Sequence, residues 1–477
     1  MAISAALRSQ LAAIVGEENL LGDELSRVLY EYDGGVDRAL PDVVVFPHSR
    51  EQVVAIVRAA RATGVPIVAR GAGTGLSGGA VAREGGIIVS LNRMRRILEV
   101  DVENARAVVE PGVVNLEFSQ SIAATGFYFA PDPSSQRACT LGGNVAENSG
   151  GPHTLLHGVT VNHITGLELV LADGSVAAIG GKELDAPGWD LTGLMTGSEG
   201  TLALVTAITL KLTRLPEAVG TLLAVYDRVG DAAATVTALT ASGITPAACE
   251  MMDGFSLRAV EAYVHAGYPL DAAAVLLLEV EGLREEVDED AAHIEALCRA
   301  AGARSVRHAA DAHERELLWS GRKNAFGAAG RIAPNNYVMD GVIPRTRIAE
   351  VLEQIEAIGQ RHGFRTGNIF HAGDGNLHPL VFFDERAGEL PRALACSRDI
   401  LRACVAVGGS ITGEHGVGIE KQDLMPWIFS PEDLAFMARV RAAFNPGGLL
   451  NPNKLLPSAH MCAEIRADAP LYREQPL

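Results

Sequence analysis

The stretch PIVARGAGTGLSGG (residues 66–79) places a run of glycine, alanine, serine and threonine directly after a short apolar run. Glycine permits positive φ angles and close backbone approach, so successive N–H groups of such a loop can point at one anion. Residues 73–78 also match GxGxxG, but a Rossmann site needs a helix directly afterwards and an acidic residue about 20 positions on. Another apolar run, GIIVSL (86–91), follows instead, and the GK[ST] of a Walker A loop is missing. We therefore predict a diphosphate cradle between two strands, although an ordinary glycine-rich turn explains this loop alone equally well.

Short apolar runs on both sides of this loop predict strands, and apolar residues at helical spacing predict two helices between them. The predicted strands lie within 43–46, 66–70, 86–91, 105–114, 163–174 and 201–215, and the helices span 50–63 and 116–125. This is an α+β pattern rather than the regular alternation of a doubly wound fold.

After Pro216 the pattern changes to longer strands that alternate with longer helices. We predict strands at 221–227, 273–282 and within 367–383, and helices at 230–242, 284–302, 347–362, 391–407 and 431–443. Strand–helix–strand units on one antiparallel sheet, a ferredoxin-like arrangement, fit this order. The last segment, NPGGLLNPNKLLP (445–457), is irregular, and we expect it to pack onto the rest of the chain.

Composition limits the class of protein. With 477 residues, 48% of them hydrophobic, the chain can form two or three domains with buried cores. The net charge of −18 argues against a nucleic-acid partner. None of the six cysteines forms a CxxC pair, so we expect neither an iron–sulfur cradle nor a zinc ribbon, and unpaired cysteines suit a reducing compartment. The first residues lack the apolar core of a signal peptide, and no run is long enough to span a membrane, so we expect a cytoplasmic protein.

Three further segments rich in glycine, serine or asparagine follow the loop in order: 131–151, 196–206 and NPNKLLP (451–457). Together the four motifs resemble the FAD-binding domain of the vanillyl-alcohol oxidase and p-cresol methylhydroxylase (PCMH) superfamily. The resemblance implies a two-subdomain, PCMH-type FAD-binding domain, a ferredoxin-like substrate (cap) domain and a C-terminal helical segment that returns to the flavin. We place an N-terminal helical segment at 1–37, the FAD domain at 38–217, the substrate and metal domain at 218–457 and a tail at 458–477.

The same resemblance assigns the cofactor contacts by motif position. The glycine loop holds the pyrophosphate, the LGGN segment lines the flavin, the third turn contacts the adenosine half or the ring, and the last motif returns to the flavin. These residues are Ala72, Gly73, Thr74, Gly75, Leu76, Ser77, Pro131, Thr140, Gly142, Gly143, Asn144, Asn148, Ser149, Glu199, Val205, Thr206, Asn453 and Lys454. Members with covalent flavin carry histidine where this chain has Thr74, so we expect FAD bound non-covalently.

Histidines gather in two glycine-flanked strings, HAGDGNLHP (371–379) and TGEHGVG (412–418). Two imidazoles and a carboxylate are a common ligand set for a divalent metal. A lone histidine is more often a polar residue of an ordered turn, but two such strings favour a site by about four to one.

These strings resemble the 2-hydroxy-acid dehydrogenase branch of the superfamily, which holds the glycolate oxidase D subunits and the D-lactate dehydrogenases. By motif position His371, His378 and Glu414 match the metal ligands (Zn, Mn or Fe), and His415 matches the catalytic base. Arg322, in WSGRKNAFGAAGR (319–331), is placed to bind the substrate carboxylate. We therefore expect FAD-dependent oxidation of a small D-2-hydroxy acid, glycolate to glyoxylate or D-lactate to pyruvate.

Two positions bear on substrate size. The same branch includes D-2-hydroxyglutarate dehydrogenases, which use a lysine for the second carboxylate and a threonine as a further substrate contact. By resemblance Val338 and Phe326 stand at these two positions, which favours small substrates over dicarboxylic acids. Lys323 and Tyr337 are open either as substrate contacts or as surface and packing residues.

Three alternatives stay open. D-lactate differs from glycolate by one methyl group, which a pocket distinguishes by only about 1–3 kcal/mol, so D-lactate can be the main substrate. The chain can also be a non-catalytic FAD-binding subunit, or a metal-dependent hydrolase whose glycine loops are turns. By resemblance we expect a second flavin-domain subunit and an iron–sulfur subunit as partners, and any membrane association through them.

Overall fold

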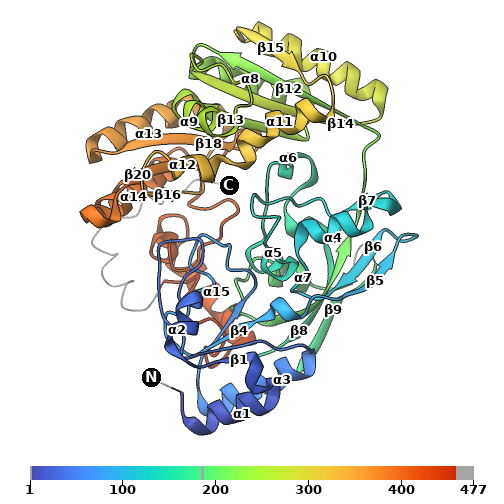
Figure 1. Cartoon of the computed structure of the whole chain (residues 1–477), viewed down its shortest axis with the longest axis vertical. Helices are drawn as coiled ribbons and strands as arrows, with labels where there is room; N and C mark the ends of the chain where they lie inside the picture. The colour runs from blue at the N-terminus through green and yellow to red at the C-terminus, as the bar shows by residue number, and fades with distance from the viewer. Residues whose placement is uncertain (1–2, 184–186, 458–477) are drawn as a thin grey trace. The chain divides into compact units, whose positions relative to one another are not determined.

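The computed structural model describes residues 3–183 and 187–457, which form two compact units. Of the described residues, the first unit holds those up to Gly150, those within Val159–Leu215 and those from Glu414 to Pro457. The second holds Gly151–Gly158 and Pro216–Gly413. In Figure 1 the first unit accordingly takes the blue-to-green part of the chain up to Leu215 and its red end, and the second takes mainly the yellow-green-to-orange part.

The first sheet of the first unit carries the glycine loop. Its strands run in the order β1 (Leu20–Leu21), β2 (Val43–Val45), β4 (Ile87–Ser90) and β3 (Ile67–Arg70). The last three are parallel and buried on both faces, so their sequences are continuous apolar runs. Helices α1 (Ala5–Val15) and α3 (Arg50–Thr63) pack together against one face, as Figure 1 shows at the blue end of the chain.

Helix α3 confirms the predicted bounds, because its ends have strong local signals. The side chain of Ser49 accepts a hydrogen bond from Gln52 N at the first turn, and Gly64 ends the helix in a left-handed conformation.

The second sheet of the first unit is antiparallel. Its order is β5 (Ile97–Asp101), β6 (Arg106–Val109), β10 (Leu204–Lys211), β8 (Ile164–Val170) and β9 (Val176–Gly180). Helices α4 (Asn115–Ile122), α5 (Leu141–Glu147) and α7 (Leu191–Met195) contribute Phe118, Leu141 and Met195 to the core that these strands bury. This unit also contains the short elements α2 (Glu24–Arg27), β7 (Phe127–Tyr128) and β11 (Thr213–Arg214), and the longer helix α15 (Pro431–Phe444).

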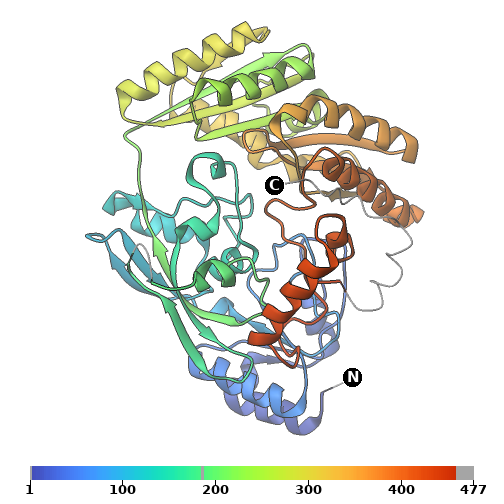
Figure 2. The same cartoon turned by 180° about the vertical axis from the view of Figure 1, so that it is seen from behind.

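The second unit is built on one large sheet in the order β15 (Ser305–His308), β12 (Ala218–Tyr226), β14 (Ala274–Gly282), β13 (Ala248–Asp253), β18 (Arg365–His371), β19 (Asn376–Leu377) and β17 (Gly341–Val342). Strands β16 (Asn335–Val338) and β20 (Pro379–Phe383) extend it beside β18. Helices α8 (Val229–Ser242), α10 (Arg284–Ala300) and α13 (Ile348–His362) form one group of neighbours, and α9 (Gly254–Val264), α11 (Ala312–Lys323) and α12 (Ala325–Ala329) form another (Figure 2). The short helix α6 (Thr154–His157) contacts β13, and α14 (Leu390–Ala406) packs on α13.

Successive side chains of β14 point alternately toward these two groups of helices, because neighbouring residues of a strand face opposite sides of the sheet. Val275 and Leu277 belong to the core that Leu257 of α9 and Leu318 of α11 also fill. Glu279 follows at the same spacing and therefore faces α11. Glu250 of β13 pairs directly with Leu277, so it lies on this face as well.

The hydrophobic pattern of the sequence reveals neither β13 nor α11, and in both cases the reason is charge. Strand β13 carries the buried carboxylate of Glu250 in the middle of an otherwise apolar run. Helix α11 directs Arg315, Trp319 and Arg322 at the sheet, so two of the residues on its buried stripe are charged.

Within residues 3–183 and 187–457, no helix combines the length and the apolar character that crossing a membrane requires.

We predict that Leu277→Ala lowers the free energy of unfolding by about 2–5 kcal/mol, because Leu277 is fully buried in a central strand and its loss leaves a cavity. Leu283→Ala is the matched control, since Leu283 lies just beyond the same strand and is 55% exposed; we expect a change of about 0.5 kcal/mol or less. Chemical denaturation of both variants measures the difference. Equal losses would contradict the assignment of Leu277 to the core.

Candidate functional site

The glycine loop follows β3 and depends on two positions where a side chain cannot fit. Gly73 has a φ of +70°, and a Cβ there would clash with the guanidinium of Arg70. A Cβ at Gly71 would clash with Thr140 Oγ1. Bare backbone therefore lies against both groups, which is the arrangement that a backbone cradle for an anion needs.

Arg70 places a buried positive charge against this loop. Its Nη1 donates to Ala80 O at 3.4 Å, and its guanidinium lies 5.5 Å from the centre of the Tyr30 ring. Burial lowers the pKa of Arg70 while Asp33 opposes that shift, and a guanidinium stays charged at neutral pH. Sequence reasoning does not single out Arg70, because an arginine at a strand end is ordinarily exposed.

Thr140 joins the glycine loop to the LGGN segment. It is the N-cap of α5, where its Oγ1 accepts from Gly143 N at 3.2 Å. A pocket lies between these motifs, and most of its lining comes from the glycine loop, the 131–151 segment and the third glycine-rich turn. The lining residues are Ala69, Arg70, Gly71, Leu91, Pro111, Thr140, Gly142, Gly143, Ala146, Met195, Ser198, Gly200, Ala203, Leu204 and Val205. The structure thus brings together three motifs that are about 130 positions apart in the chain at their extremes.

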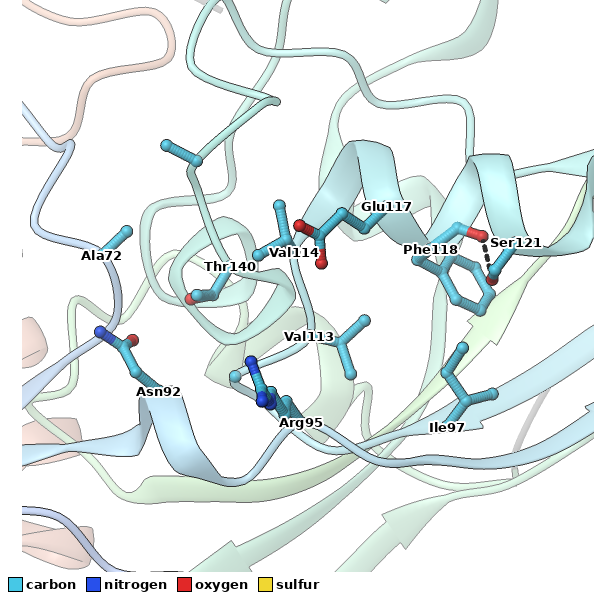
Figure 3. A pocket seen from close by; sticks show the side chains of 12 residues that line it. Ala72, Asn92, Arg95, Ile97, Val113, Val114, Glu117, Phe118, Ser121 and Thr140 are labelled. Carbon is cyan, nitrogen blue, oxygen red and sulfur yellow. Dashed lines mark hydrogen bonds between the residues drawn. The ribbon is translucent and has the colours of Figure 1, made fainter.

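A second pocket, of about 400 Å³, shares Thr140 with the first (Figure 3). Ala72 of the glycine loop, Asn92, Arg95 and the α4 residues Glu117 and Ser121 are among its lining. Arg95 and Asn92 are missed by sequence reasoning, because they belong to no recognisable motif. An elongated dinucleotide with a diphosphate at its middle fits this arrangement. The glycine loop presents bare backbone, Arg70 supplies a buried guanidinium, and the two pockets adjoin at Thr140.

The remaining predicted cofactor residues lie around the same motifs. Asn144 is buried and accepts from Asn115 Nδ2 at 3.0 Å, and Pro131 O accepts from the same amide at 2.9 Å. Asn148 caps α5 with a φ of +54°, and Ser149 O accepts from Thr160. These backbone roles neither require nor exclude a cofactor contact, so those assignments stay predictions.

The C-terminal segment returns to the glycine loop through Asn451 and Lys454. Lys454 Nζ is buried and donates to Val81 O at 2.7 Å, and burial lowers the pKa of this amine to about 8. Asn451 Nδ2 donates to Gly79 O at 2.9 Å. Asn453 is exposed and donates to Glu84, and its predicted contact with FAD stays a prediction. Asn451 is the asparagine of this motif that contacts the glycine loop.

Glu199 holds the segment that carries the second histidine string. Its buried carboxylate accepts from the N–H groups of Val417 and Gly418, each at 2.7 Å. Two backbone N–H bonds fix both the position and the direction of this segment within the first unit. Each carboxylate oxygen of Glu199 accepts one of these backbone bonds. The predicted contact of Glu199 with FAD stays a prediction.

Gly416 is enclosed by two carboxylates. A Cβ there would lie 2.5 Å from Glu147 Oε2 and 2.9 Å from Glu199 Oε1. Burial raises the pKa of Glu147 well above its usual value, and the neighbouring Glu199 raises it further. Burial also raises the pKa of Glu199, although its two N–H bonds oppose the shift. The pair therefore retains a proton more readily than two separate carboxyl groups would.

Val205 and Thr206 occupy alternate faces of β10. Val205 lines the pocket that the glycine loop shares with the LGGN segment. Thr206 is buried, and its hydroxyl donates to Glu168 Oε1 at 2.8 Å.

In the second unit, Glu250 joins two residues that sequence reasoning assigned to different roles. Its Oε1 lies 2.7 Å from His371 Nδ1, and its Oε2 accepts from Arg322 Nε. Burial alone would raise the pKa of Glu250, but the charges of His371 and Arg322 outweigh burial and hold this pKa below its usual value. Because Arg322 Nη2 also lies 3.5 Å from both ring nitrogens of His371, the predicted carboxylate-binding arginine and a predicted metal ligand lie side by side.

The two histidines of the first string also lie together. The ring centres of His371 and His378 are 5.0 Å apart, and both side chains are buried. His378 Nδ1 lies 3.2 Å from Met339 O and 3.9 Å from Asp340 Oδ1. Each Nδ1 thus faces an oxygen acceptor, and an imidazole protonated at Nδ1 presents Nε2 as a ligand atom. This donor set fits a divalent metal.

Glu414 and His415 belong to the first unit, whereas His371 and His378 belong to the second. The three-ligand metal set and the role of His415 as base therefore stay predictions. Of the open substrate contacts, Tyr337 is buried on β16, and Lys323 is exposed with its Nζ 5.8 Å from the centre of the Trp319 ring. Val338 packs against the core of the second unit, and the side chain of Phe326 lies outside the described part of the chain.

Two family models match the chain. The C-terminal domain of FAD-linked oxidases matches residues 215–455, and an FAD-binding domain matches residues 41–180. The second match contains the glycine loop and the LGGN segment, and the first contains both histidine strings.

Relatives of known name span nearly the whole chain. The glycolate oxidase subunit GlcD of Escherichia coli is 47% identical over 95% of this chain and 91% of its own length. The protein of the same name from Bacillus subtilis is 39% identical over 94% of this chain and 96% of its own length. A probable mitochondrial D-lactate dehydrogenase of Danio rerio is 30% identical over 94% of this chain and 91% of its own length.

Among solved structures, substrate-bound p-cresol methylhydroxylase matches with a TM-score of 0.81 at 18% identity, over 95% of this chain and 97% of that one. The 4-ethylphenol oxidase of Gulosibacter chungangensis matches with a TM-score of 0.76 at 19% identity, over 96% and 98%. These likenesses confirm the predicted α+β fold with a PCMH-type FAD-binding domain.

We predict that Gly73→Ala purifies with less than a tenth of the wild-type flavin, because its Cβ would displace Arg70 at a positive φ. Acid precipitation releases the flavin for measurement against protein. Gly447→Ala is the matched control, since Gly447 lies in the same unit and its Cβ would meet nothing within 4 Å. A Gly73→Ala protein that retains its full flavin would contradict the assignment of this loop.

Proposed function

We propose that this chain, which belongs to the family of FAD-linked oxidases, oxidises a small D-2-hydroxy acid such as glycolate or D-lactate. The family makes it an FAD-dependent oxidoreductase. The substrate class follows from the site and from relatives named as glycolate oxidase subunits and D-lactate dehydrogenases.

One observation carries the proposal: Arg322 and His371 share the buried carboxylate of Glu250. A guanidinium binds a planar carboxylate through paired N–H groups, and an imidazole pair binds a divalent cation. A 2-hydroxy acid offers both partners on adjacent carbons, a carboxylate and a hydroxyl. The two groups therefore match the two ends of one small substrate.

The cofactor would be held by the glycine loop, by Arg70 and by the walls of the two pockets of the first unit. When bound, FAD supplies the acceptor for the hydride that leaves the substrate carbon. Thr74 offers no nucleophile comparable to histidine at that position, so we infer a non-covalent cofactor.

The metal would be held by His371, His378 and Glu414. A divalent ion there supplies the positive charge that lowers the pKa of a bound hydroxyl. Glu414 follows Gly413 directly in the chain, and Gly413 N donates to Asp340 Oδ2 at 2.9 Å. Arg322 would bind the substrate carboxylate and so fix the direction of the C–H bond.

We propose that His415 is the base that accepts the proton of the substrate hydroxyl. The substrate hydroxyl loses a proton while the carbon loses a hydride, and together these losses convert the alcohol to a carbonyl. A neutral imidazole has a pKa suited to accept that proton at neutral pH. The assignment rests on the position of His415 in TGEHGVG, next to the proposed ligand Glu414.

Small substrates are favoured by Val338, which offers no charge for a second carboxylate. A pocket distinguishes the methyl group of D-lactate from the hydrogen of glycolate by only about 1–3 kcal/mol, so we propose that both are oxidised.

We further infer partners that carry the electrons away. Relatives from Escherichia coli and Bacillus subtilis are named as subunits, and this chain has no CxxC pair for a cluster. A second flavin-domain subunit and an iron–sulfur subunit would supply that path. A non-catalytic subunit would not need a buried arginine, a histidine pair and the TGEHGVG string, so the catalytic role is the better explanation.

We predict that glycolate and D-lactate bleach the flavin of the purified protein when oxygen is excluded, whereas L-lactate and D-2-hydroxyglutarate do not. The physical reasons are Val338, which offers no charge for a second carboxylate, and Arg322, which would fix the direction of the C–H bond. Anaerobic absorbance titration measures the reduction. A yellow protein that neither small acid bleaches would overturn the proposed substrate class, and a colourless protein that does not take up FAD would overturn the oxidoreductase.

We predict that His415→Asn lowers the rate of flavin reduction about 10²–10⁴-fold, the range expected for loss of a general base. Stopped-flow reduction by glycolate measures the rate. His308→Asn is the matched control, because His308 is 44% exposed on β15 and pairs with Glu295, and we expect the wild-type rate for it. A near-normal rate for His415→Asn would remove this residue from the base assignment.

A further inference from the structure

Glu250 and His371 meet because two strands pair directly. Glu250 of β13 and His371 of β18 are opposite residues of an antiparallel pair, so their side chains leave the same face about 5 Å apart. The side chain of Glu250 is 1% exposed and that of His371 is 4% exposed, so water does not compete for their hydrogen bond. The backbone register therefore fixes this contact before any ligand arrives.

The carboxylate of Glu250 divides its two oxygens between two partners. Oε1 lies within hydrogen-bonding distance of His371 Nδ1, and Oε2 accepts from Arg322 Nε. A hydrogen bond at Nδ1 fixes the ring tautomer, so that Nε2 is the unprotonated nitrogen. A guanidinium that donates through Nε to one carboxylate can also donate through its terminal nitrogens to another. In Arg322, Nη2 lies 3.5 Å from both ring nitrogens of His371, so a bound carboxylate would share Nη2 with that ring.

Helix α11 has a separate attachment that does not use Glu250. Arg315, Trp319 and Arg322 follow at spacings of four and three residues, so they lie on one face of the helix. Glu279 of β14 accepts from Arg315 at 2.7 Å and from Trp319 Nε1 at 2.6 Å.

Glu279 makes two further contacts, with Thr221 at 2.7 Å and His153 at 3.1 Å. Burial alone would raise the pKa of Glu279, but the hydrogen bonds and charges of His153 and Arg315 outweigh burial and hold this pKa far below its usual value. The helix is thus docked on Glu279, and only its last turn depends on Glu250.

We propose that Glu250 is a positioning residue, which directs Nε2 of His371 at the metal and the terminal nitrogens of Arg322 at the substrate carboxylate. The inference rests on the proposed function and deepens it, because one side chain then sets the geometry of both ends of the substrate. The two partners face different oxygens of the carboxylate, and an amide replaces one of those oxygens with an NH2 group, so one partner would meet a donor in place of its acceptor. Both the metal and the substrate therefore bind more weakly without this carboxylate.

Glu250→Gln tests the proposal in the full-length flavoprotein. We expect a metal affinity about 10–100-fold weaker, measured by competition with a chelator and by elemental analysis with zinc and manganese as probes. We also expect the KM for glycolate and for D-lactate to rise by about tenfold or more, with the flavin content unchanged. The metal measurement does not depend on turnover, so it separates positioning from a general loss of activity.

Glu279→Gln is the matched control. Glu279 lies on the neighbouring strand, on the same face, is equally buried and also holds α11, but its hydrogen bonds go to none of the proposed ligands. We expect this variant to lower the melting temperature and to leave metal affinity and KM at the wild-type values. If both variants lower only the melting temperature, Glu250 is a structural residue and the proposal is overturned.

Glu250→Asp provides the test if Glu250→Gln does not fold. It keeps the charge that neutralises Arg322 but is one methylene shorter, so it cannot reach both partners, and we expect partial loss of metal affinity and a raised KM. An unchanged KM and metal affinity in Glu250→Asp would overturn the proposal. If no 2-hydroxy acid reduces the flavin of the wild-type protein, the proposed function itself is overturned. If these acids reduce the flavin of the wild-type protein and of Glu250→Gln equally well, only the positioning role is overturned.

Discussion

A carboxylate removed from water must be matched by donors, and this constraint organises both units of the protein. Glu199 is matched by two backbone N–H groups, and so it holds the segment that carries the second histidine string. Glu250 is matched by an arginine and a histidine, and Glu279 by four side chains. Because each acceptor needs its partners in one geometry, the buried charges fix the chain segments that carry the candidate chemistry.

The two units meet different demands. The first must let a backbone approach an anion, which explains Gly71 and Gly73 beside a buried guanidinium. Its positive groups, Arg70 and Lys454, balance an interior that also holds Glu147 and Glu199. The second must present charged and ligating side chains from rigid strands, which a large antiparallel sheet does well. In the proposed function, backbone would form the flavin site and side chains would form the substrate site.

The likeness to relatives named as glycolate oxidase subunits and D-lactate dehydrogenases accords with this division. The glycine-rich motifs serve an FAD-linked oxidation in general, whereas Arg322, the histidine pair and Glu250 define which anion is oxidised in the proposed reaction. Selectivity between a hydrogen and a methyl group is small in energy, so the choice of substrate depends on fine positioning more than on the set of residues. Glu250 contacts both Arg322 and His371, which is why a positioning role is proposed for it.

The sequence alone determined the local features: the strand–glycine loop–strand order, helix α3 with its caps, and the strings that hold His371, His378 and His415. These are readable because their signals lie within a few residues of one another. Only the tertiary structure decided that Arg70 lies against the glycine loop, that Asn451 rather than Asn453 reaches it, and that Glu199 and Glu250 hold the histidine strings. Glu250 meets its partners 72 and 121 residues away, and Glu199 meets Val417 218 residues away. A buried charge is indistinguishable from a surface charge in one sequence, because what makes it buried and paired is the register of distant strands.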